Sequence, residues 1–473
     1  MKDLNKLFIN GQWRDSQSGE TLEVINPATE SPVAQVASAN KADVDLAVTA
    51  AKKAFDSWSN TPSAERSKRI KAIAQRMEER KDELVKAISQ TMGCPEHIAG
   101  WLQVEGPIEG MQLFADHCQL TDTTEEAGSS LVVKEPIGVC AFINPWNYPL
   151  HQLVGKVGAA LAAGCTMVVK PSEQTPLQDY IMAEILAECG IPDGVFNLVP
   201  GTGTVVGEAL STHPDVNMVS FTGSTQAGIK VAQAAAPTVK RVTQELGGKS
   251  PFIITEDADL AAAVKYGVED VMLNSGQTCT ALTRMLVPEA KYKEALTIAK
   301  EVANGLQVGT EQDAFLGPMS SRAQQQRVLE YIQLGIEEGA ELVCGGIESP
   351  LPEQPGYYVA PTILGQVNNQ MRIAREEIFG PVLCIIPYQD LDEAIAIAND
   401  TPYGLSSGVY AKDESAALAI ARKIRAGQCY INGSFFNYLA PFGGYKQSGN
   451  GREFAGIGVE EFLETKAIQR GEF

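Results

Sequence analysis

From Gly138 onward the sequence alternates between short apolar or β-branched runs and alanine-rich stretches with helical periodicity. The first series predicts strands at 138–143, 165–169, 195–199 and 216–221, with helices between them at 151–163, 177–189 and 203–210. Strands that alternate with helices form βαβ units, in which each helix crosses back over the sheet. The sequence therefore predicts an α/β fold with a parallel, doubly wound, Rossmann-like sheet.

A second alternating series begins near Pro251. It predicts strands at 252–254, 284–287, 382–386 and 429–431, and helices at 259–272, 289–304, 320–338 and 391–399. Ahead of both series, helical spacing predicts helices at 41–58 and 63–92. A chain of 473 residues exceeds one ordinary core, so we expect two α/β domains that meet near 247–250.

The composition narrows the kinds of partner that the chain binds. A formal net charge of −20 repels nucleic acid and anionic membranes. No apolar run approaches the roughly 20 residues that span a bilayer, and the N-terminus shows no signal-peptide core. We therefore expect a cytoplasmic protein whose partners are neither nucleic acid nor a membrane.

Nine cysteines occur without any Cys-x-x-Cys spacing, and no two of the four histidines are placed like a pair of metal ligands. This pattern argues against a disulfide framework and against a zinc site, so we expect reduced thiols and no metal. Because histidines are few, a carboxylate is the expected general base.

Cys279 differs from the other cysteines in its setting. It ends the run Gly276-Gln277-Thr278-Cys279 and precedes Thr280, among small and polar residues. Most cysteines are small buried hydrophobes, whereas a nucleophilic thiol needs access and thiolate character. The setting of Cys279 permits both.

Two further motifs offer groups that a nucleophile needs. Glu245 follows the strand-like segment 239–243 and precedes two glycines, which makes it a candidate base, with a solvated loop glutamate as the alternative. Trp146 and Asn147 lie in the first turn after a predicted strand, where the Asn147 amide is able to hold an oxyanion. A rigid aromatic turn is the other interpretation of that motif.

Candidate cofactor residues follow the predicted strands of the first series. Lys170 and Glu173 lie at the carboxyl end of a strand, where open α/β sheets bind ligands. The run 201–207 is one residue off the dinucleotide fingerprint and is weak evidence alone. Gly223 and Ser224 precede a helix, so the N–H groups of their turn are suited to a pyrophosphate.

Taken in order, these motifs resemble those of the aldehyde dehydrogenase superfamily, over residues from about Phe8 to Lys466. The motifs are Pro145-Trp146-Asn147, Lys170-Pro171-Ser172-Glu173, Phe221-Thr222-Gly223-Ser224, Glu245-Leu246-Gly247-Gly248-Lys249, Gly276-Gln277-Thr278-Cys279, Glu377-Ile378-Phe379-Gly380-Pro381 and Pro441-Phe442-Gly443-Gly444. Several short motifs in one order are far more specific than any single one.

The resemblance implies a catalytic scheme of the hydrolytic, non-acylating type. Cys279 attacks the aldehyde to form a thiohemiacetal, whose oxyanion the Asn147 amide and the Cys279 backbone N–H stabilise. Loss of hydride to the nicotinamide leaves a thioester, and Glu245 activates the water that hydrolyses it. Lys156 and Glu453 also match polar positions near the family's active site, without a settled role.

The resemblance also implies the cofactor, NAD⁺ with NADP⁺ as an alternative. Lys170 and Glu173 are assigned to the adenosine ribose, and Gly223 and Ser224 to the pyrophosphate. The remaining cofactor positions, which include those at the nicotinamide and its ribose, are Glu377, Phe379, Leu246 and Trp146.

One departure from the family concerns the substrate tunnel. At Gly155 many members carry a bulky aromatic residue that narrows the tunnel, so the glycine predicts a wider one. Aromatic walls are expected from Trp101, Tyr148, Phe435, Phe436 and Tyr438.

We predict three parts. Residues 1–117 and 138–247 form a dinucleotide-binding domain, 248–445 form a catalytic domain, and 118–137 with 446–473 form oligomerisation segments of a homodimer or homotetramer. Residues 131–134 either pair across an interface or form a hairpin over their own domain.

Two rival functions stay open. One is a CoA-acylating dehydrogenase, against which the presence of Glu245 argues, because water needs a base more than a thiol does. The other is a catalytically silent binding or structural protein on the same fold.

Overall fold

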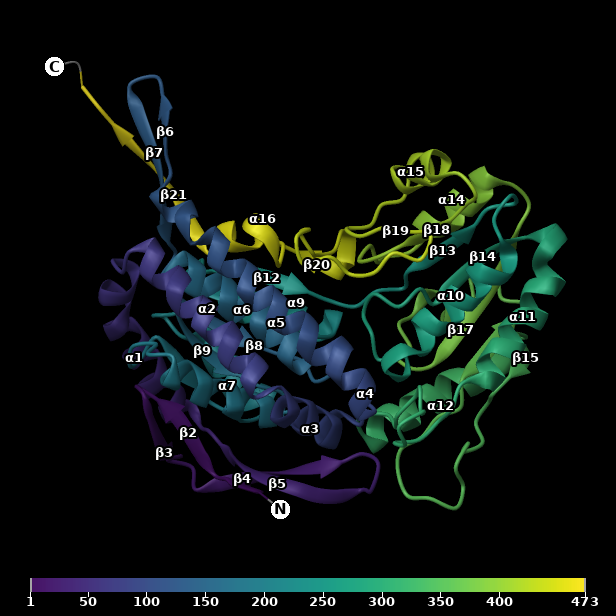
Figure 1. The fold of residues 1–473 in the computed structure, drawn as a ribbon, viewed down its shortest axis with the longest axis horizontal. Coiled ribbons are helices and arrows are strands. Elements are labelled where there is room, and N and C mark those ends of the chain that lie inside the picture. Colours follow the sequence, from purple (N-terminus) through teal and green to yellow (C-terminus); the bar gives the residue numbers. More distant parts are fainter. Residues whose placement is uncertain (1, 472–473) are drawn as a thin grey trace.

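The computed structural model describes residues 2–471, and its larger elements form two sheets side by side (Figure 1). The first sheet has the strand order β20-β12-β11-β8-β9-β10-β2-β3. These strands are Gly449–Asn450, Arg241–Glu245, Met218–Thr222, Val139–Ile143, Thr166–Lys170, Phe196–Leu198, Lys6–Ile9 and Gln12–Asp15. Its five central strands, β12 to β10, are parallel, which confirms the predicted α/β class.

The second sheet has the order β15-β16-β17-β14-β13-β18-β19 and is parallel except at the β15–β16 pair. These strands are Glu341–Cys344, Thr362–Gly365, Val382–Tyr388, Arg284–Pro288, Pro251–Ile254, Gly408–Tyr410 and Tyr430–Ile431. The chain passes from one sheet to the other between Glu245 and Pro251.

Helices flank both sheets (Figure 1). Around the first sheet they are α1 (Lys41–Ser59), α2 (Ser63–Glu79), α3 (Lys81–Met92), α4 (Glu96–Ile98), α5 (Gly106–Phe114), α6 (Pro149–Ala163), α7 (Leu177–Glu188), α8 (Glu208–Thr212), α9 (Thr225–Ala235) and α16 (Ala455–Glu460). Around the second they are α10 (Leu260–Met272), α11 (Tyr292–Gly305), α12 (Arg322–Glu337), α13 (Arg372–Arg375), α14 (Leu391–Asn399) and α15 (Glu414–Ala421). Strands such as β8 and β9 are buried along their whole length, as parallel strands covered on both faces must be.

Two predicted helices differ from those in the structure. The predicted helix 63–92 is two helices, because Arg80 leaves the helical conformation and the acidic residues Asp82 and Glu83 begin a new first turn. The predicted helix 203–210 starts with a π-helical turn, Gly203–Gly207, and continues as α8.

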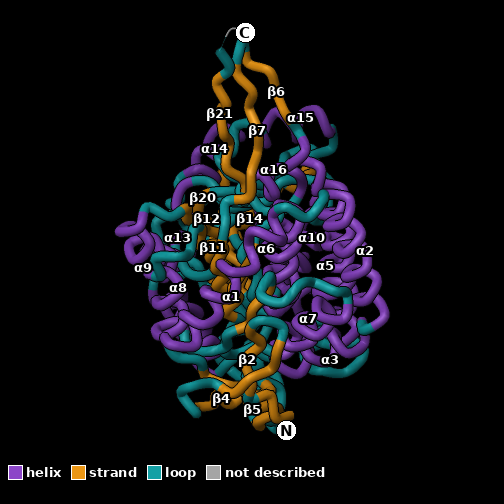
Figure 2. The backbone as a smooth tube through the Cα atoms, turned by 90° about the vertical axis from the view of Figure 1, so that its left-hand side faces the viewer, coloured by secondary structure: helices purple, strands orange, loops and turns teal. Residues whose placement is uncertain are grey.

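Two small sheets lie at opposite ends of the first large sheet (Figure 2). One contains β1 (Lys2–Leu4), β5 (Ser31–Ser38) and β4 (Glu20–Asn26). The other, which we call the flap, contains β21 (Leu463–Gln469), β7 (Ser130–Pro136) and β6 (Thr124–Ala127), and it projects from the body with the C-terminus. The two predicted oligomerisation segments therefore meet in one sheet.

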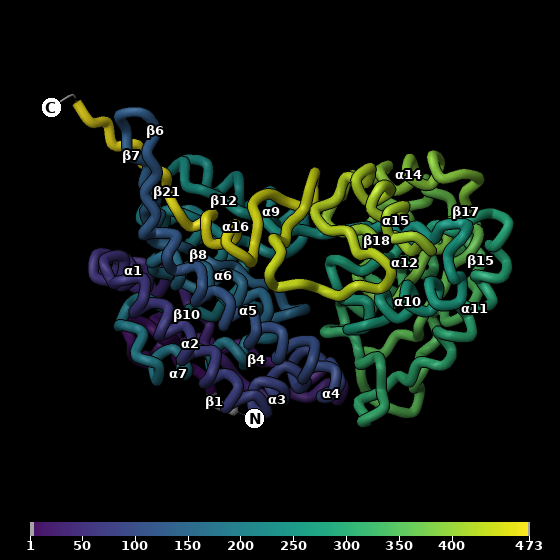
Figure 3. The backbone as a smooth tube through the Cα atoms, turned by 45° about the horizontal axis from the view of Figure 1, so that its top comes forward, coloured from purple at the N-terminus to yellow at the C-terminus, as the bar shows by residue number. Residues whose placement is uncertain are grey.

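The C-terminal part of the chain links these regions. After β19 it runs back toward the first sheet, adds β20 beside β12, and continues through α16 into the flap (Figure 3). None of the helices described within residues 2–471 is both long enough and apolar enough to span a bilayer.

Candidate active site

The loop that carries Cys279 leaves α10 through three residues with left-handed backbone. Asn274, Ser275 and Gly276 have φ values of 53°, 55° and 70°. A Cβ atom on Gly276 would lie 2.1 Å from the backbone of Gly380, so the loop is pressed against that chain and only glycine fits. The path of the loop just before Cys279 is therefore fixed by this contact.

Hydrogen bonds tie the same loop to the turn that contains Asn147. The Asn147 side-chain amide donates to the Gln277 carbonyl at 3.0 Å, and the Asn274 amide donates to the Asn147 carbonyl at 3.1 Å. Gln277 is itself held, since its side-chain oxygen accepts the Ser320 N–H at 2.8 Å. The structure thus brings the predicted nucleophile loop and the predicted oxyanion donor together.

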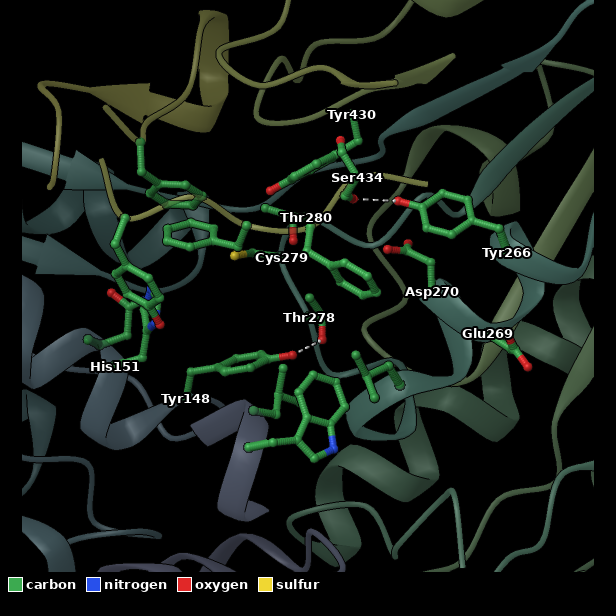
Figure 4. A pocket seen from close by; sticks show the side chains of 18 of the residues that line it. Tyr148, His151, Tyr266, Glu269, Asp270, Thr278, Cys279, Thr280, Tyr430 and Ser434 are labelled. Atoms are coloured by element: carbon green, nitrogen blue, oxygen red, sulfur yellow. Dashed lines mark hydrogen bonds between the residues drawn. The ribbon is translucent and has the colours of Figure 1, made fainter. Parts of the chain in front are cut away.

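Cys279 is half-buried and lines two adjoining cavities. The first, of about 350 Å³, is mainly aromatic and includes all five predicted wall residues; we call it the aromatic cavity (Figure 4). The second, of about 710 Å³, is lined by the predicted residues Trp146, Asn147, Gly223, Ser224, Glu245, Leu246, Glu377 and Phe379; we call it the polar cavity. Burial, with Glu377 and Glu245 nearby, raises the pKa of the Cys279 thiol, so the thiol is protonated here.

Glu245 ends β12 and faces the polar cavity from a buried position. Neither carboxyl oxygen has a hydrogen-bond partner among residues 2–471. Burial raises its pKa well above the ordinary value, and the negative charge of Glu453 raises it further. Both oxygens have free acceptor capacity, and the raised pKa makes the carboxylate a stronger base.

Glu453 is held by Lys156, a fully buried residue of α6. The Lys156 ammonium lies 2.7 Å from a Glu453 oxygen and 2.7 Å from the Thr222 hydroxyl, and it also donates to Gln152. Thr222 and Gln152 both line the polar cavity, so this buried ion pair lies directly behind its wall.

The turn before α9 forms one end of the polar cavity. Ser224 caps the helix by accepting the Ala227 N–H, and the N–H groups of Thr225 and Gln226 donate to nothing within residues 2–471. Gly223 is closely packed, because a Cβ atom there would lie 2.7 Å from the Phe221 ring. Free N–H groups at a helix N-terminus are suited to a phosphate.

Glu377 and Phe379 form another part of the same wall. Glu377 accepts the Gly248 N–H at 2.9 Å, and burial raises its pKa to about 7. The Phe379 ring meets Trp146 edge-on, with centroids 5.4 Å apart.

Lys170 and Glu173 pair with each other at 3.2 Å, but neither lines the polar cavity. The Lys170 ammonium also donates to the carbonyls of Pro171 and Gly201, and Glu173 accepts the Gly203 N–H at 2.7 Å. The pair therefore lies at a separate position, at the carboxyl end of β9.

Comparison with known proteins identifies the group to which this architecture belongs. The sequence model of the aldehyde dehydrogenase family matches residues 13–468. The chain belongs to the aldehyde dehydrogenase family. It is an oxidoreductase that acts on aldehydes.

Individual relatives of this dehydrogenase are similar over nearly their whole length. A Pseudomonas protein named 3-succinoylsemialdehyde-pyridine dehydrogenase is 49% identical over 471 residues, which cover 99% of each chain. Aldehyde dehydrogenase C of Pseudomonas syringae, solved as a cysteine-to-alanine mutant with NAD⁺ and octanal, is 49% identical with a TM-score of 0.96, covering 98% of this chain and 96% of that one. A Mycobacterium tuberculosis aldehyde dehydrogenase solved with NAD⁺ is 42% identical with a TM-score of 0.96, covering 99% of each chain.

The prediction that Gly155 widens the substrate tunnel of this dehydrogenase is wrong. A Cβ atom at Gly155 would lie 3.0 Å from the Phe454 ring and 3.4 Å from Glu453, and Gly155 does not line the aromatic cavity. Phe454 is buried and packs in a cluster with His151, Phe436 and Tyr438. The space that a large side chain at 155 would take is filled by Phe454.

Sequence reasoning missed several residues that line the two cavities. Gln324 and Arg327 reach the polar cavity from α12, and His151 and Asp270 line the aromatic one. The α12 residues carry no motif and lie more than forty positions from the nearest one. His151 was visible only as one helical histidine, and burial lowers its pKa to about 3.

Proposed function

We propose that this dehydrogenase oxidises an aldehyde to a carboxylic acid with NAD⁺, with Cys279 as the covalent nucleophile. The observation that carries the proposal is that Cys279 lines both cavities, so its thiol is open to one ligand from each side. The aromatic cavity suits an aldehyde with an apolar chain, and the polar cavity suits a dinucleotide.

In the first step the Cys279 sulfur bonds to the aldehyde carbon, and the carbonyl oxygen becomes an oxyanion. An asparagine amide has two N–H donors, and the bond to Gln277 uses one. That bond fixes the amide and leaves its other N–H for the oxyanion. The Cys279 backbone N–H, which donates to no backbone carbonyl in residues 2–471 and contacts the thiol of the same residue, supplies a second donor.

The thiol proton needs an acceptor, and so does the proton of the hydrolytic water. We assign both to Glu245, a residue with unpaired carboxyl oxygens that lines the same cavity as Cys279. Glu245 releases the thiol proton to solvent before hydrolysis. After hydride loss, water attacks the thioester carbon, its proton passes to Glu245, and the carbon–sulfur bond breaks to release the acid. A CoA-acylating reaction is not favoured, because a buried base beside the cysteine serves water rather than a thiol.

The polar cavity fits a dinucleotide, and its volume and the free N–H groups of Thr225 and Gln226 support this. Ser224 and Gly223 would lie by the pyrophosphate, and Glu377, Phe379, Leu246 and Trp146 would surround the nicotinamide end. When bound, NAD⁺ supplies the acceptor for the hydride. Glu173 would accept hydrogen bonds from the adenosine ribose with the lone pairs that Gly203 and Lys170 leave free.

Two broader properties belong to the same proposal. The flap would join copies of the chain into a homodimer or homotetramer, because its residues Leu131 to Val133 and Ile468 remain partly exposed. All nine cysteines carry free thiols, which supports a reducing compartment such as the cytoplasm.

Replacement of the nucleophile tests the proposal. Cys279→Ala should abolish NADH formation from an aldehyde, measured at 340 nm, while NAD⁺ binding measured by calorimetry stays close to wild type. Cys189→Ala, which changes a half-buried thiol outside both cavities, should keep full activity. Turnover of a tenth of the wild-type rate or more in Cys279→Ala would contradict the covalent mechanism.

A further inference from the structure

Two carboxylates line the aromatic cavity, Glu269 and Asp270, and the proposed mechanism uses neither. Asp270 lies on α10 and is half-buried. Figure 4 shows its carboxyl group directed into the cavity, on the far side of Thr280 from Cys279, whereas the neighbouring Glu269 points outward. One Asp270 oxygen accepts the Leu282 N–H at 2.8 Å, and the other accepts no hydrogen bond within residues 2–471.

The cavity offers Asp270 no positive partner. Among residues 2–471, those that line it include neither lysine nor arginine. His151 is neutral, because burial lowers its pKa to about 3. Glu269 already forms an ion pair with Lys265 on the outer face of the helix. Asp270 is therefore an unpaired acid that faces a chamber of aromatic rings.

Aromatic faces and a carboxylate attract the same kind of ligand. A ring carries a negative face that attracts cations within about 6 Å of its centroid, and a carboxylate attracts them by charge. Tyr266, Tyr430 and Trp101 line the same cavity as Asp270. A cationic group would gain from both, whereas a second carboxylate would be repelled in surroundings too apolar to screen it.

We propose that the aromatic cavity selects aldehydes whose tail ends in a cationic nitrogen, which Asp270 binds, and excludes aldehydes whose tail ends in a carboxylate. The inference rests on the proposed function, since it places the aldehyde in this cavity with its reactive end at Cys279. It adds a specificity-determining residue, Asp270.

Burial raises the pKa of Asp270 to about 7, so the acid is partly protonated at neutral pH. The selectivity should therefore grow as pH rises through that value. The other titratable groups that line the cavity stay neutral there: the pKa values of Tyr148, Tyr266, Tyr430, Tyr438 and Cys279 are raised, and that of His151 is lowered. Glu269, paired with Lys265 and directed outward, is the one other charged residue of the lining.

A pair of probes of equal shape tests the selectivity. In 4-(trimethylammonio)butanal the nitrogen is cationic, and in 5,5-dimethylhexanal a carbon replaces it. We expect kcat/KM to favour the cation by about tenfold at pH 8 and by less at pH 6. Turnover of the neutral aldehyde with no preference for the cation would overturn the inference and leave the proposed function intact. Failure to oxidise any aldehyde would instead overturn the proposed function.

Two variants assign the effect to one carboxylate. Asp270→Asn keeps an oxygen for the Leu282 N–H, so the loop stays in place, but it removes the charge. The ratio of kcat/KM for the cationic aldehyde to kcat/KM for the neutral one should fall toward one. The value of kcat/KM for 5-oxopentanoate should rise, and that for the neutral aldehyde should change by less than about twofold. Glu269→Gln is the matched control and should leave all three values unchanged. Equal losses for all probes in Asp270→Asn would show that Asp270 only holds the loop, and the pH dependence of the wild-type ratio decides the matter if the variant does not fold.

Discussion

Glu245 combines two properties that rarely occur together in a carboxylate, burial and the lack of any hydrogen-bond partner for its oxygens within residues 2–471. Replacement by glutamine keeps the shape and removes the base. Glu245→Gln should lower steady-state turnover by about a hundredfold or more, with a burst of NADH before the slow phase, because acylation outruns hydrolysis. Rapid-mixing absorbance at 340 nm measures both phases.

The pH dependence of the wild type provides a check on the same residue. The pKa of Glu245 is raised, so the fraction in the basic form grows as pH rises, and kcat should rise with it. This limb of the profile should disappear in Glu245→Gln. A variant with near-wild-type turnover would point to Glu453 as the base instead.

The predicted preference for NAD⁺ over NADP⁺ depends on Glu173. Its carboxylate would bind ribose hydroxyls of NAD⁺ but would face the 2′-phosphate of NADP⁺ with a like charge, while Lys170 at 3.2 Å offsets part of that repulsion. We expect a preference for NAD⁺ without exclusivity. Glu173→Ser should raise kcat/KM for NADP⁺ relative to NAD⁺ by about tenfold. A wild type that already favours NADP⁺, or an unchanged ratio in the variant, would contradict this role.

At the scale of elements, α6 and the segment before α16 pack so closely that Gly155 has no spare room. Gly155→Trp should lower the stability by about 1–3 kcal/mol, because the indole would have to displace the buried Phe454 ring. Thermal unfolding of the variant measures the loss. Gly100→Trp is the control, since no atom lies within 4 Å of a Cβ at that helical position, and its unfolding midpoint should stay near that of the wild type.

Periodicity predicted the strands and helices around the site well, because parallel strands and their covering helices are governed by local pattern. It could not predict Phe454 against Gly155, since this contact joins residues about 300 positions apart in sequence. It also missed the break at Arg80, where no glycine or proline marks the end of the helix. The site motifs could be recognised because they are local: Cys279, Glu245 and Asn147 each occur in a short run of unusual composition.

At the scale of the whole molecule, the change of sheet between Glu245 and Pro251 supports the proposed division into a dinucleotide-binding domain (1–117 and 138–247) and a catalytic domain (248–445). Sequence pattern did not indicate that β20, from the C-terminal segment, completes the first sheet beside β12. Such pairings depend on tertiary proximity, which a two-residue strand does not reveal.

We predict that the flap joins copies of the chain into an oligomer. Leu131 and Ile468 are paired across β7 and β21 and lie on one face, and Ile468 is 43% exposed. Leu131→Asp should reduce the mass measured by light scattering after size exclusion, because a charge would be buried in the interface between copies. Thr465→Asp, on the opposite face of β21, is the control for a local change in the sheet. A wild type that elutes as a monomer would contradict the proposal.

Because Cys279 lines two cavities, the aldehyde and the nucleotide need not enter and leave by the same path. Spent nucleotide is able to leave and be replaced while an acyl group still occupies the sulfur. An inhibitor that binds in the aromatic cavity would compete with the aldehyde and leave the affinity for the nucleotide unchanged. An inhibitor that binds in the polar cavity would compete with the nucleotide and leave the affinity for the aldehyde unchanged. The two inhibitors would bind this enzyme at the same time, so the residual activity with both present would be the product of the residual activities with each alone.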